Sequence, residues 1–295
     1  MNYLVTGGAG FIGSNLVDHL VADGHRVKII DNLSTGKREN LNPAAELIIA
    51  DITKYDEIAP HFAGMDGVFH LAALPRVQVS IENPRATHDA NINGTFNVLL
   101  AAKEARVKRL VYSASSSAYG EPESLPLKET MRPNPKSPYG LQKYVGEHYA
   151  RLFSMFYGLE TVSLRYFNVY GPRMASEGAY CTVIAVFLRQ KREGKPLTIC
   201  GDGTQTRDFT HVRDVAAANI LAMDSLNVGR GEVINIGAGN NHSVNEVAEL
   251  IGGAVEHLPP RVEPHDTLAD NSLARELLGW EPKVRFEDGV GELLF

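Results

Sequence analysis

Short apolar runs alternate with longer amphipathic stretches through the first half of the chain. The runs have the length of buried strands, and the stretches between them carry apolar residues at helical spacing. The pattern predicts strands over Tyr3–Val5, Arg26–Ile30, Glu46–Ile49, Gly67–His70, Arg109–Tyr112 and Thr161–Arg165. It predicts helices over Phe11–Val21, Thr87–Ala105 and Tyr139–Phe156. Strands separated by helices favour an α/β fold in which helices cover both faces of a parallel sheet.

The pattern changes after about Asn168, where polar residues and glycines become frequent. The helices predicted here are shorter: Tyr180–Lys191, Val212–Asp224 and Val244–Ile251. The predicted strands are scattered: Leu197–Cys200 and Val233–Ile236. We therefore expect a sheet domain over residues 1–167 and a smaller lobe formed mainly by 168–295, with roughly 205–236 returning to the sheet domain.

Two further segments interrupt the regular pattern. Gly120–Pro138 contains five prolines and leads directly into a predicted helix, which indicates an irregular active-site loop rather than a linker. The last residues, Gly291–Phe295, resemble an unfinished helix, so we expect a chain that is naturally short or truncated.

Composition and charge narrow the class of protein. The chain has 295 residues, 44% of them hydrophobic and 22% charged, which excludes a disordered or collagen-like protein. Its net charge is −6 and it has no long basic run, so we expect no nucleic-acid partner. No apolar run is long enough to span a membrane, and no signal peptide opens the chain. Its two cysteines lack a disulfide or zinc spacing, so we expect a cytoplasmic protein without a metal site.

A glycine cluster follows the first predicted strand and opens the first predicted helix. Gly7, Gly10 and Gly13 stand in the order GxxGxxG within the segment Thr6–Gly13. Glycine allows a tight turn and a close approach of backbone to a pyrophosphate, and the helix N-terminus offers N–H groups and partial positive charge. An ordinary flexible turn would explain the glycines alone.

The second predicted strand supports a dinucleotide site. Asp31 ends that strand 18 residues after Gly13, where a carboxylate binds the adenine ribose and repels a 2′-phosphate. Lys37 and Arg38 nearby would favour NADP, but solvated loop charges are the simpler explanation. Further candidates follow the third and fourth strands: Asp51, Ile52, Leu71, Ala72 and Ala73. The sequence thus predicts a Rossmann-type doubly wound sheet that binds NAD.

A second group of residues carries proton chemistry. Tyr139 and Lys143 lie one helical turn apart, and a lysine cation there would lower the pKa of the tyrosine. Ser115 belongs to a run of serines after the fifth strand, at the sheet edge where α/β proteins bind ligands. Taken singly, the pair is typical of a helix surface and the serines of a loop. Together with the glycine site they indicate proton transfer beside a hydride acceptor.

These motifs resemble the extended short-chain dehydrogenase/reductases. The resemblance rests on TGGAGFIGS at residues 6–14, the serine run before Tyr119-Gly120, and SPYGLQK at residues 137–143. Downstream, LRYFNVYGPR at 164–173, GDGTQTRDF at 201–209 and Leu278-Gly279-Trp280 are similar to the UDP-glucose (UDP-galactose) 4-epimerase family. The likeness spans nearly the whole chain.

The resemblance implies roles for individual residues. Counting four positions back from Tyr119 makes Ser115 the catalytic hydroxyl beside Tyr139 and Lys143. It adds to the cofactor shell Phe11, Ile12, Asn32, Asn91 and Phe167. It implies that the nucleotide sugar is bound by Asn168, Arg207, Arg261, Glu263 and Thr267. For Arg207, a structural salt bridge with Asp208 or Asp214 is the alternative to diphosphate binding.

The family contains several activities. Dehydratases and decarboxylases of this family carry acidic residues after the catalytic hydroxyl, whereas Ser116 and Ser117 follow here. The resemblance therefore implies NAD-dependent 4-epimerisation of a UDP-hexose by transient oxidation at C4. Thr267, at the position that faces C2 of the sugar, leaves room for an N-acetyl group, and Cys200 replaces an aromatic that stacks on uracil.

The sequence leaves competing interpretations of the function open. The chain could be another nucleotide-sugar enzyme, such as a uronate epimerase, a 4,6-dehydratase or a reductase. It could also be a non-catalytic dinucleotide sensor.

The helices Thr87–Ala105 and Tyr139–Phe156 resemble those that form a four-helix interface in this family, so we expect a homodimer.

Overall fold

The structure is a computed structural model that describes residues 1–121, 123–175, 181–260 and 265–294. Its apolar runs form one seven-stranded sheet in the order β11-β6-β5-β4-β1-β2-β3, with every neighbouring pair parallel. The strands are β1 (Asn2–Thr6), β2 (Arg26–Ile30), β3 (Glu46–Ile48), β4 (Gly67–His70), β5 (Arg109–Ser115), β6 (Glu160–Tyr166) and β11 (Arg230–Ile236). This confirms the predicted doubly wound parallel sheet.

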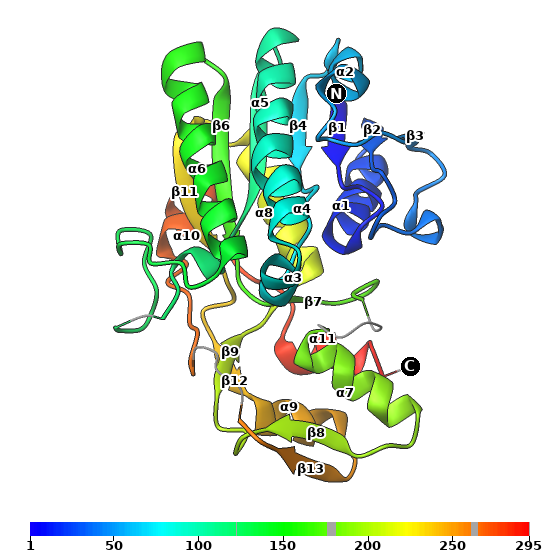
Figure 1. Cartoon of the computed structure of the whole chain (residues 1–295), viewed down its shortest axis with the longest axis vertical. Coiled ribbons are helices and arrows are strands. Elements are labelled where there is room, and N and C mark those ends of the chain that lie inside the picture. Colours follow the sequence, from blue (N-terminus) through cyan, green and yellow to red (C-terminus); the bar gives the residue numbers. More distant parts are fainter. Residues whose placement is uncertain (122, 176–180, 261–264, 295) are drawn as a thin grey trace.

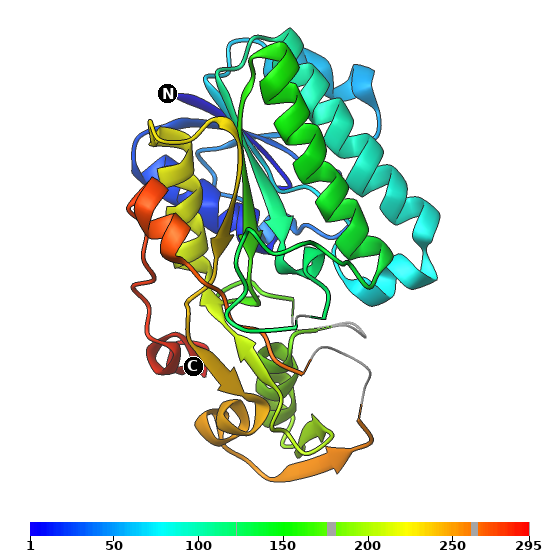
Figure 2. The same ribbon diagram turned by 90° about the vertical axis from the view of Figure 1, so that its left-hand side faces the viewer.

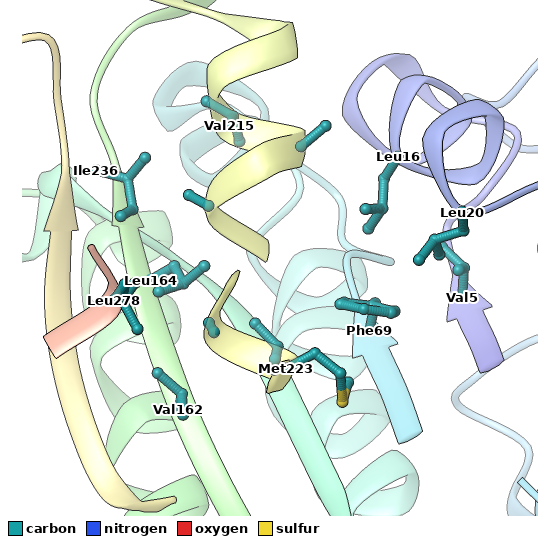
Figure 3. Packing of buried hydrophobic residues seen from close by; sticks show 14 of the residues in the cluster. Val5, Leu16, Leu20, Phe69, Val162, Leu164, Val215, Met223, Ile236 and Leu278 are labelled. Carbon is teal, nitrogen blue, oxygen red and sulfur yellow. The ribbon is translucent and has the colours of Figure 1, made fainter. Parts of the chain in front are cut away.

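Helices cover both faces of the sheet because its strands are apolar on both sides. One layer holds α1 (Phe11–Ala22), α8 (Val212–Asp224) and α10 (Ser272–Leu278). The other layer holds α2 (Tyr55–Ile58), α5 (Gly94–Glu104) and α6 (Pro138–Tyr157). Figure 2 shows the two layers on either side of the strands. In the first layer, Leu16 and Leu20 of α1 point toward Val5 and Phe69 of the sheet, and Val215 of α8 lies on the side of Ile236 (Figure 3).

The predicted helix over Thr87–Ala105 is divided in the structure. Pro84 starts α4 (Pro84–His88), a π-helical turn follows over Asp89–Asn93, and α5 continues to Glu104. A short helix, α3 (Val77–Glu82), precedes them. A π turn inserts an extra residue into the helix, which periodicity in the sequence does not reveal.

The rest of the chain builds a lobe at the carboxyl edge of the sheet, drawn in the lower half of Figure 1. Its helices are α7 (Val183–Arg192), α9 (Val244–Ile251) and α11 (Phe286–Gly291). Its strands pair as β7 (Val169–Tyr170) with β10 (Thr210–His211), β9 (Thr206–Asp208) with β12 (Asn241–Ser243), and β8 (Leu197–Cys200) with β13 (Val255–Leu258). The predicted helix start at Tyr180 lies outside the described residues.

The chain leaves the sheet and returns to it. After β7 and α7, α8 packs against α1, and β11 then pairs with β6 in register from Val233–Ser163 to Ile236–Tyr166. Residues 120–137 contain no helix, and Leu127 makes a single bridge to Ala269, among the positions the structure describes there. No helix within the described ranges is long and apolar enough to cross a bilayer.

Candidate active site

The glycine turn joins β1 to α1. The Gly7 N–H donates to Ile30 O at 2.8 Å and the Gly10 N–H to Gly7 O at 3.1 Å, which closes the turn. A Cβ on Gly13 would lie 2.2 Å from Gly7 O, so only glycine lets the helix start this close to the turn. The first turn of α1 carries Phe11 and Ile12, no acidic residue and no side-chain cap. Its N–H groups and dipole suit the pyrophosphate of a dinucleotide.

The carboxylate of Asp31 lies beside this turn. Oδ2 accepts the Ala9 N–H at 3.0 Å and Oδ1 accepts the Leu33 N–H at 2.8 Å, which fixes the side chain after β2. Asn32 donates to Asp51 Oδ2 at 3.1 Å, so the ends of β2 and β3 are tied together. A fixed carboxylate at this edge suits ribose hydroxyls, and with the uncapped helix it fits NAD.

Other predicted cofactor residues line the same edge. The N–H groups of Leu71 and Ala72 both bond Thr6, the first through its carbonyl at 3.1 Å and the second through its hydroxyl at 3.3 Å. These bonds hold the segment Leu71–Ala73 against the glycine turn. Ile52 is 7% exposed and lies where a Cβ on Gly94 would touch it.

Two predicted cofactor residues are engaged within the protein. The Asn91 amide accepts the Leu74 N–H at 2.8 Å and donates to Leu74 O at 2.9 Å and to Gln142 Oε1 at 2.8 Å. Asn91 therefore shapes the loop after β4 through its side chain. Phe167 is fully buried among Tyr119, Leu127 and Ala269, so its side chain packs under the site.

The proton-handling residues meet where β5 ends and α6 begins. Ser115 Oγ donates to Ser117 Oγ at 3.1 Å and accepts the Ser117 N–H at 3.2 Å. A Cβ on Gly140 would lie 2.6 Å from Ser117 O, so glycine after Tyr139 allows α6 to start against the serine turn. The structure thus brings Ser115 and Tyr139 within hydrogen-bonding reach.

The electrostatics differ from the sequence-based expectation. Burial raises the pKa of Tyr139, and only the hydrogen bond with Ser115 opposes that rise. Lys143 is 3% exposed, donates to Ser113 O at 2.7 Å and lies 4.9 Å from the centre of the Tyr112 ring. Burial lowers the pKa of Lys143 to about 7, with Glu147 opposing. The pKa of Tyr139 is therefore raised in the structure, where the sequence led us to expect a lowered value, because desolvation dominates.

The predicted substrate residues lie in the lobe near the sheet. Asn168 has a φ of 27° and donates to Asp208 O at 3.1 Å and Thr267 Oγ1 at 3.2 Å. Arg207 Nη1 donates to Thr206 O at 2.8 Å and His265 O at 2.9 Å. Asn168, Arg207 and Thr267 therefore come together on neighbouring strands and loops. Arg261 and Glu263 lie outside the described residues.

Sequence reasoning missed three contributors. Ser80 on α3 accepts the Tyr139 N–H at 3.0 Å, and a single serine on a short helix gives no signal. Asp208, within a motif already noted, is fully buried and accepts the N–H groups of Ala238, Gly239 and Ala269 at 2.7 to 3.0 Å. Glu147 forms a buried ion pair with Arg165, for which helical spacing gave no warning.

A nucleotide cradle at the carboxyl edge of a doubly wound sheet defines the class: this is an NAD-binding enzyme of the Rossmann type. The chain belongs to the NAD dependent epimerase/dehydratase family, whose model matches residues 3–237. It is 38% identical over 306 residues to a UDP-glucose 4-epimerase of Mycolicibacterium smegmatis, covering 99% of this chain and 97% of the relative.

Solved structures agree with this assignment. The UDP-glucose 4-epimerase of Thermotoga maritima, solved with UDP-glucose, superposes with a TM-score of 0.95 at 40% identity, covering 100% of this chain and 97% of that one. The UDP-N-acetylglucosamine 4-epimerase of Methanobrevibacter ruminantium, solved with UDP-N-acetylmuramic acid, gives a TM-score of 0.95 at 38% identity, covering 99% and 96%. The family prediction made from the motifs is confirmed.

Proposed function

We propose that this enzyme interconverts the C4 epimers of a UDP-hexose, with UDP-glucose and UDP-galactose as the expected pair. The observation that carries this proposal is the hydrogen bond between Ser115 and Tyr139 beside the glycine turn. The two residues that follow Ser115 in the sequence are Ser116 and Ser117, and neither is acidic. An acid there would assist elimination of water. Relatives named as 4-epimerases at 38% and 40% identity support the same reaction.

In the proposed mechanism, Tyr139 removes the proton of the sugar 4-hydroxyl, and Ser115 bridges the two oxygens. The glycine turn and Asp31 would hold NAD, which would supply an acceptor for the C4 hydride and the donor for its return to the opposite face of the sugar. Tyr139 then gives the proton back, so that no external reductant is consumed. Because burial raises the pKa of Tyr139, the ammonium of Lys143 has to favour the phenolate once the site is filled.

The lobe supplies the proposed sugar-nucleotide contacts. Arg207 offers a guanidinium to the diphosphate, and Asn168 offers its amide beside Thr267. We assign Arg261 and Glu263 to the nucleotide end by resemblance alone. The small side chain of Thr267 leaves space on the C2 side, so we propose that N-acetylated hexoses are accepted too.

Incubation with single UDP-hexoses, without added NAD, tests the function. Proton NMR should show UDP-glucose and UDP-galactose converging on the same mixture, and UDP-N-acetylglucosamine giving its galacto epimer. Conversion only with stoichiometric added NAD would contradict the closed oxidation–reduction cycle. A 4-keto-6-deoxy product would identify a dehydratase, and conversion restricted to UDP-glucuronate would identify a uronate epimerase. Failure with N-acetylated sugars alone would make the inference from Thr267 wrong.

We also propose that different parts of the chain bind the cofactor and the nucleotide sugar. Residues 1–167, together with α8 and β11 from the expected returning segment of roughly 205–236, hold the cofactor, and the remainder of 168–295, including Arg207, holds the nucleotide sugar. Pairing of β11 with β6 and packing of α8 on α1 support this division. A cytoplasmic location is proposed as well, because the sequence has only two cysteines, Cys181 and Cys200, at a spacing that suggests no disulfide framework.

A homodimer through α5 and α6 is the final part of this proposal. The two helices lie side by side on one face (Figure 1). They expose large apolar side chains, among them Leu141 of α6 and a group further along the two helices. These are Phe96, Leu152, Met155, Phe156 and Tyr157, with Met155 and Phe156 67% and 69% exposed. Such a patch on a helix pair is typical of a protein interface.

Light scattering tests the interface with the double variant M155E/F156E. The wild type should be a dimer and the variant a monomer, because two carboxylates cannot be buried unpaired. Leu226, 91% exposed in the loop before β11, provides the matched control L226E, which should stay dimeric. A dimeric double variant would show that another surface is used.

A further inference from the structure

A buried ion pair lies behind the proposed catalytic lysine. Glu147 follows Lys143 by one turn of α6, and Arg165 lies near the end of β6. Arg165 Nε donates to Glu147 Oε1 at 2.9 Å and Nη2 to Oε2 at 2.7 Å, a bidentate contact between two side chains that are each 3% exposed. Neither residue has a place in the chemistry described so far.

Stability does not account for this pair. Removing two charges from water costs several kcal/mol per ion, and apolar replacements of buried pairs are often neutral or stabilising. Arg165 adds to the cost, because its Nη1 is buried and has no hydrogen-bond partner among the described residues. The guanidinium also lies 4.4 Å from the centre of the Tyr119 ring, which holds it from the other side. A costly pair in a fixed place points to a function.

Lys143 is surrounded by groups that could titrate. His70 on β4, Tyr112 on β5 and Glu147 on α6 interact with Lys143 directly, and Tyr139 stands one turn earlier on α6. Arg165 on β6 pairs with Glu147. Burial lowers the pKa of His70 to about 3 and raises the pKa of Tyr112 far above its usual range, so both rings are neutral at pH 7. Glu147 is the carboxylate that acts on the ammonium.

We propose that Glu147 and Arg165 are positioning residues for Lys143: Glu147 keeps the buried ammonium charged, and Arg165 keeps Glu147 ionised and in place. The proposal rests on the proposed catalytic role of Lys143. Glu147 lies one turn after Lys143 on α6, and both side chains are buried. Burial lowers the pKa of Lys143, and Glu147 opposes that shift. Burial likewise raises the pKa of Glu147, and Arg165 opposes it. Glu147, held in place by Arg165, therefore limits the loss of charge that desolvation alone would cause at Lys143.

The experiment measures the titration of Lys143 directly and through the rate. Lysine labelled with ¹³C at Cε reports the charge by NMR, and K143R assigns the signal. In E147Q the titration midpoint should fall by about one pH unit, because an opposite charge has been removed, and the alkaline limb of kcat should move with it. E147D keeps the charge and should return the midpoint toward the wild-type value.

A second variant, E147M/R165M, keeps the inference testable if E147Q does not fold. E147Q leaves Arg165 without its anion, whereas E147M/R165M removes both charges and keeps the volume. Because Glu147 is the charged group that acts on Lys143, the titration midpoint should fall in this variant too. The control E160Q removes a carboxylate that pairs with Arg109 at the far end of β6. It should change neither the titration midpoint of Lys143 nor the alkaline limb of kcat.

The possible outcomes distinguish a failure of the positioning role from a failure of the proposed function. A wild-type midpoint and alkaline limb in the folded E147M/R165M protein would overturn the inference, whatever the turnover. Full turnover of K143M would instead remove the proposed role of Lys143, while the midpoint shift would still report on Glu147. A lowered midpoint with a lowered alkaline limb, rescued by E147D, supports the positioning role.

Discussion

The large sheet and the substrate lobe are stabilised in different ways. Seven parallel strands bury apolar side chains on both faces, so the sheet is held by two extensive apolar cores. The lobe has a smaller core and short two-stranded ladders. Its connection to the sheet depends on polar contacts to backbone, above all on Asp208, which binds three N–H groups from two other segments.

This difference suggests separate effects of substitutions on cofactor binding and on sugar binding. If the proposed division holds, the closely packed sheet edge binds NAD, and the lobe, which has the smaller core, binds the sugar. Substitutions in the sheet should therefore act on cofactor binding and stability together. Substitutions in the lobe should act on the KM for the sugar.

Tyr139 lies at the boundary between the two regions, and its loss should have the largest effect. Y139F removes the proton acceptor and should lower kcat by about 10²- to 10⁴-fold, with NAD and sugar binding retained. Steady-state kinetics and NAD titration measure both. Y144F, on the next turn of α6, is the control and should keep wild-type turnover. Near-normal turnover of Y139F would remove Tyr139 from the mechanism.

Asp208 tests the lobe. In D208N one oxygen becomes an NH₂ group that faces backbone donors, and lost charge-assisted hydrogen bonds cost about 1.5–3 kcal/mol each. The KM for the UDP-sugar should rise about 10- to 100-fold, while the Kd for NAD stays within about 2-fold. D202N changes a nearby exposed carboxylate and should leave KM unaltered. Equal loss of NAD and sugar binding would show that the two regions are not separable.

Gly13 tests the sheet edge. A Cβ there would meet Gly7 O at 2.2 Å, so G13A must displace the turn at a cost of about 1–3 kcal/mol. We expect calorimetry to show NAD affinity lowered by about 10-fold and a lower Tm. G291A adds a methyl group where nothing lies within 4 Å and should be neutral. Unchanged NAD affinity in G13A would mean that the turn does not contact the cofactor.

His70 gives the smallest expected effect, a pH dependence of the sheet's stability. Its Nδ1 accepts from Thr6 Oγ1 at 2.7 Å, and its Nε2 donates to Thr95 Oγ1 at 3.0 Å, since Thr95 itself donates to Asn91 O. The folded pKa is about 3, below the unfolded value of 6.5, because burial disfavours the cation. The stabilisation is thus present above pH 6.5 and is lost as pH falls toward 3.

Urea unfolding at pH 6, 5.5 and 5 measures that loss. One group titrating only in the unfolded state contributes about 1.4 kcal/mol per pH unit, so H70Q should flatten the slope by that amount. H88Q, at an exposed position of α4, should keep the wild-type slope. An unchanged slope in H70Q would show that His70 is charged in the folded state.

Prediction from the sequence succeeded for the elements with strong periodicity. The helices Val212–Asp224 and Val244–Ile251 match the structure residue for residue, as does the strand Leu197–Cys200. Prediction failed where the contacts are long-range. The two-residue strands β7 and β10 pair only because the fold brings them together, and the π turn before α5 has no signature in periodicity.

The sequence by itself determined the sheet and the glycine turn with Asp31, because these depend on local spacing and strand order. Its resemblance to a known family proposed Ser115, Tyr139 and Lys143 as the catalytic group. Only the tertiary structure decided how those groups are charged. Burial raises the pKa of Tyr139, and Glu147, set against Arg165 from another strand, opposes the discharge of Lys143. Desolvation and long-range pairing depend on what surrounds a side chain, and no spacing along the chain encodes that.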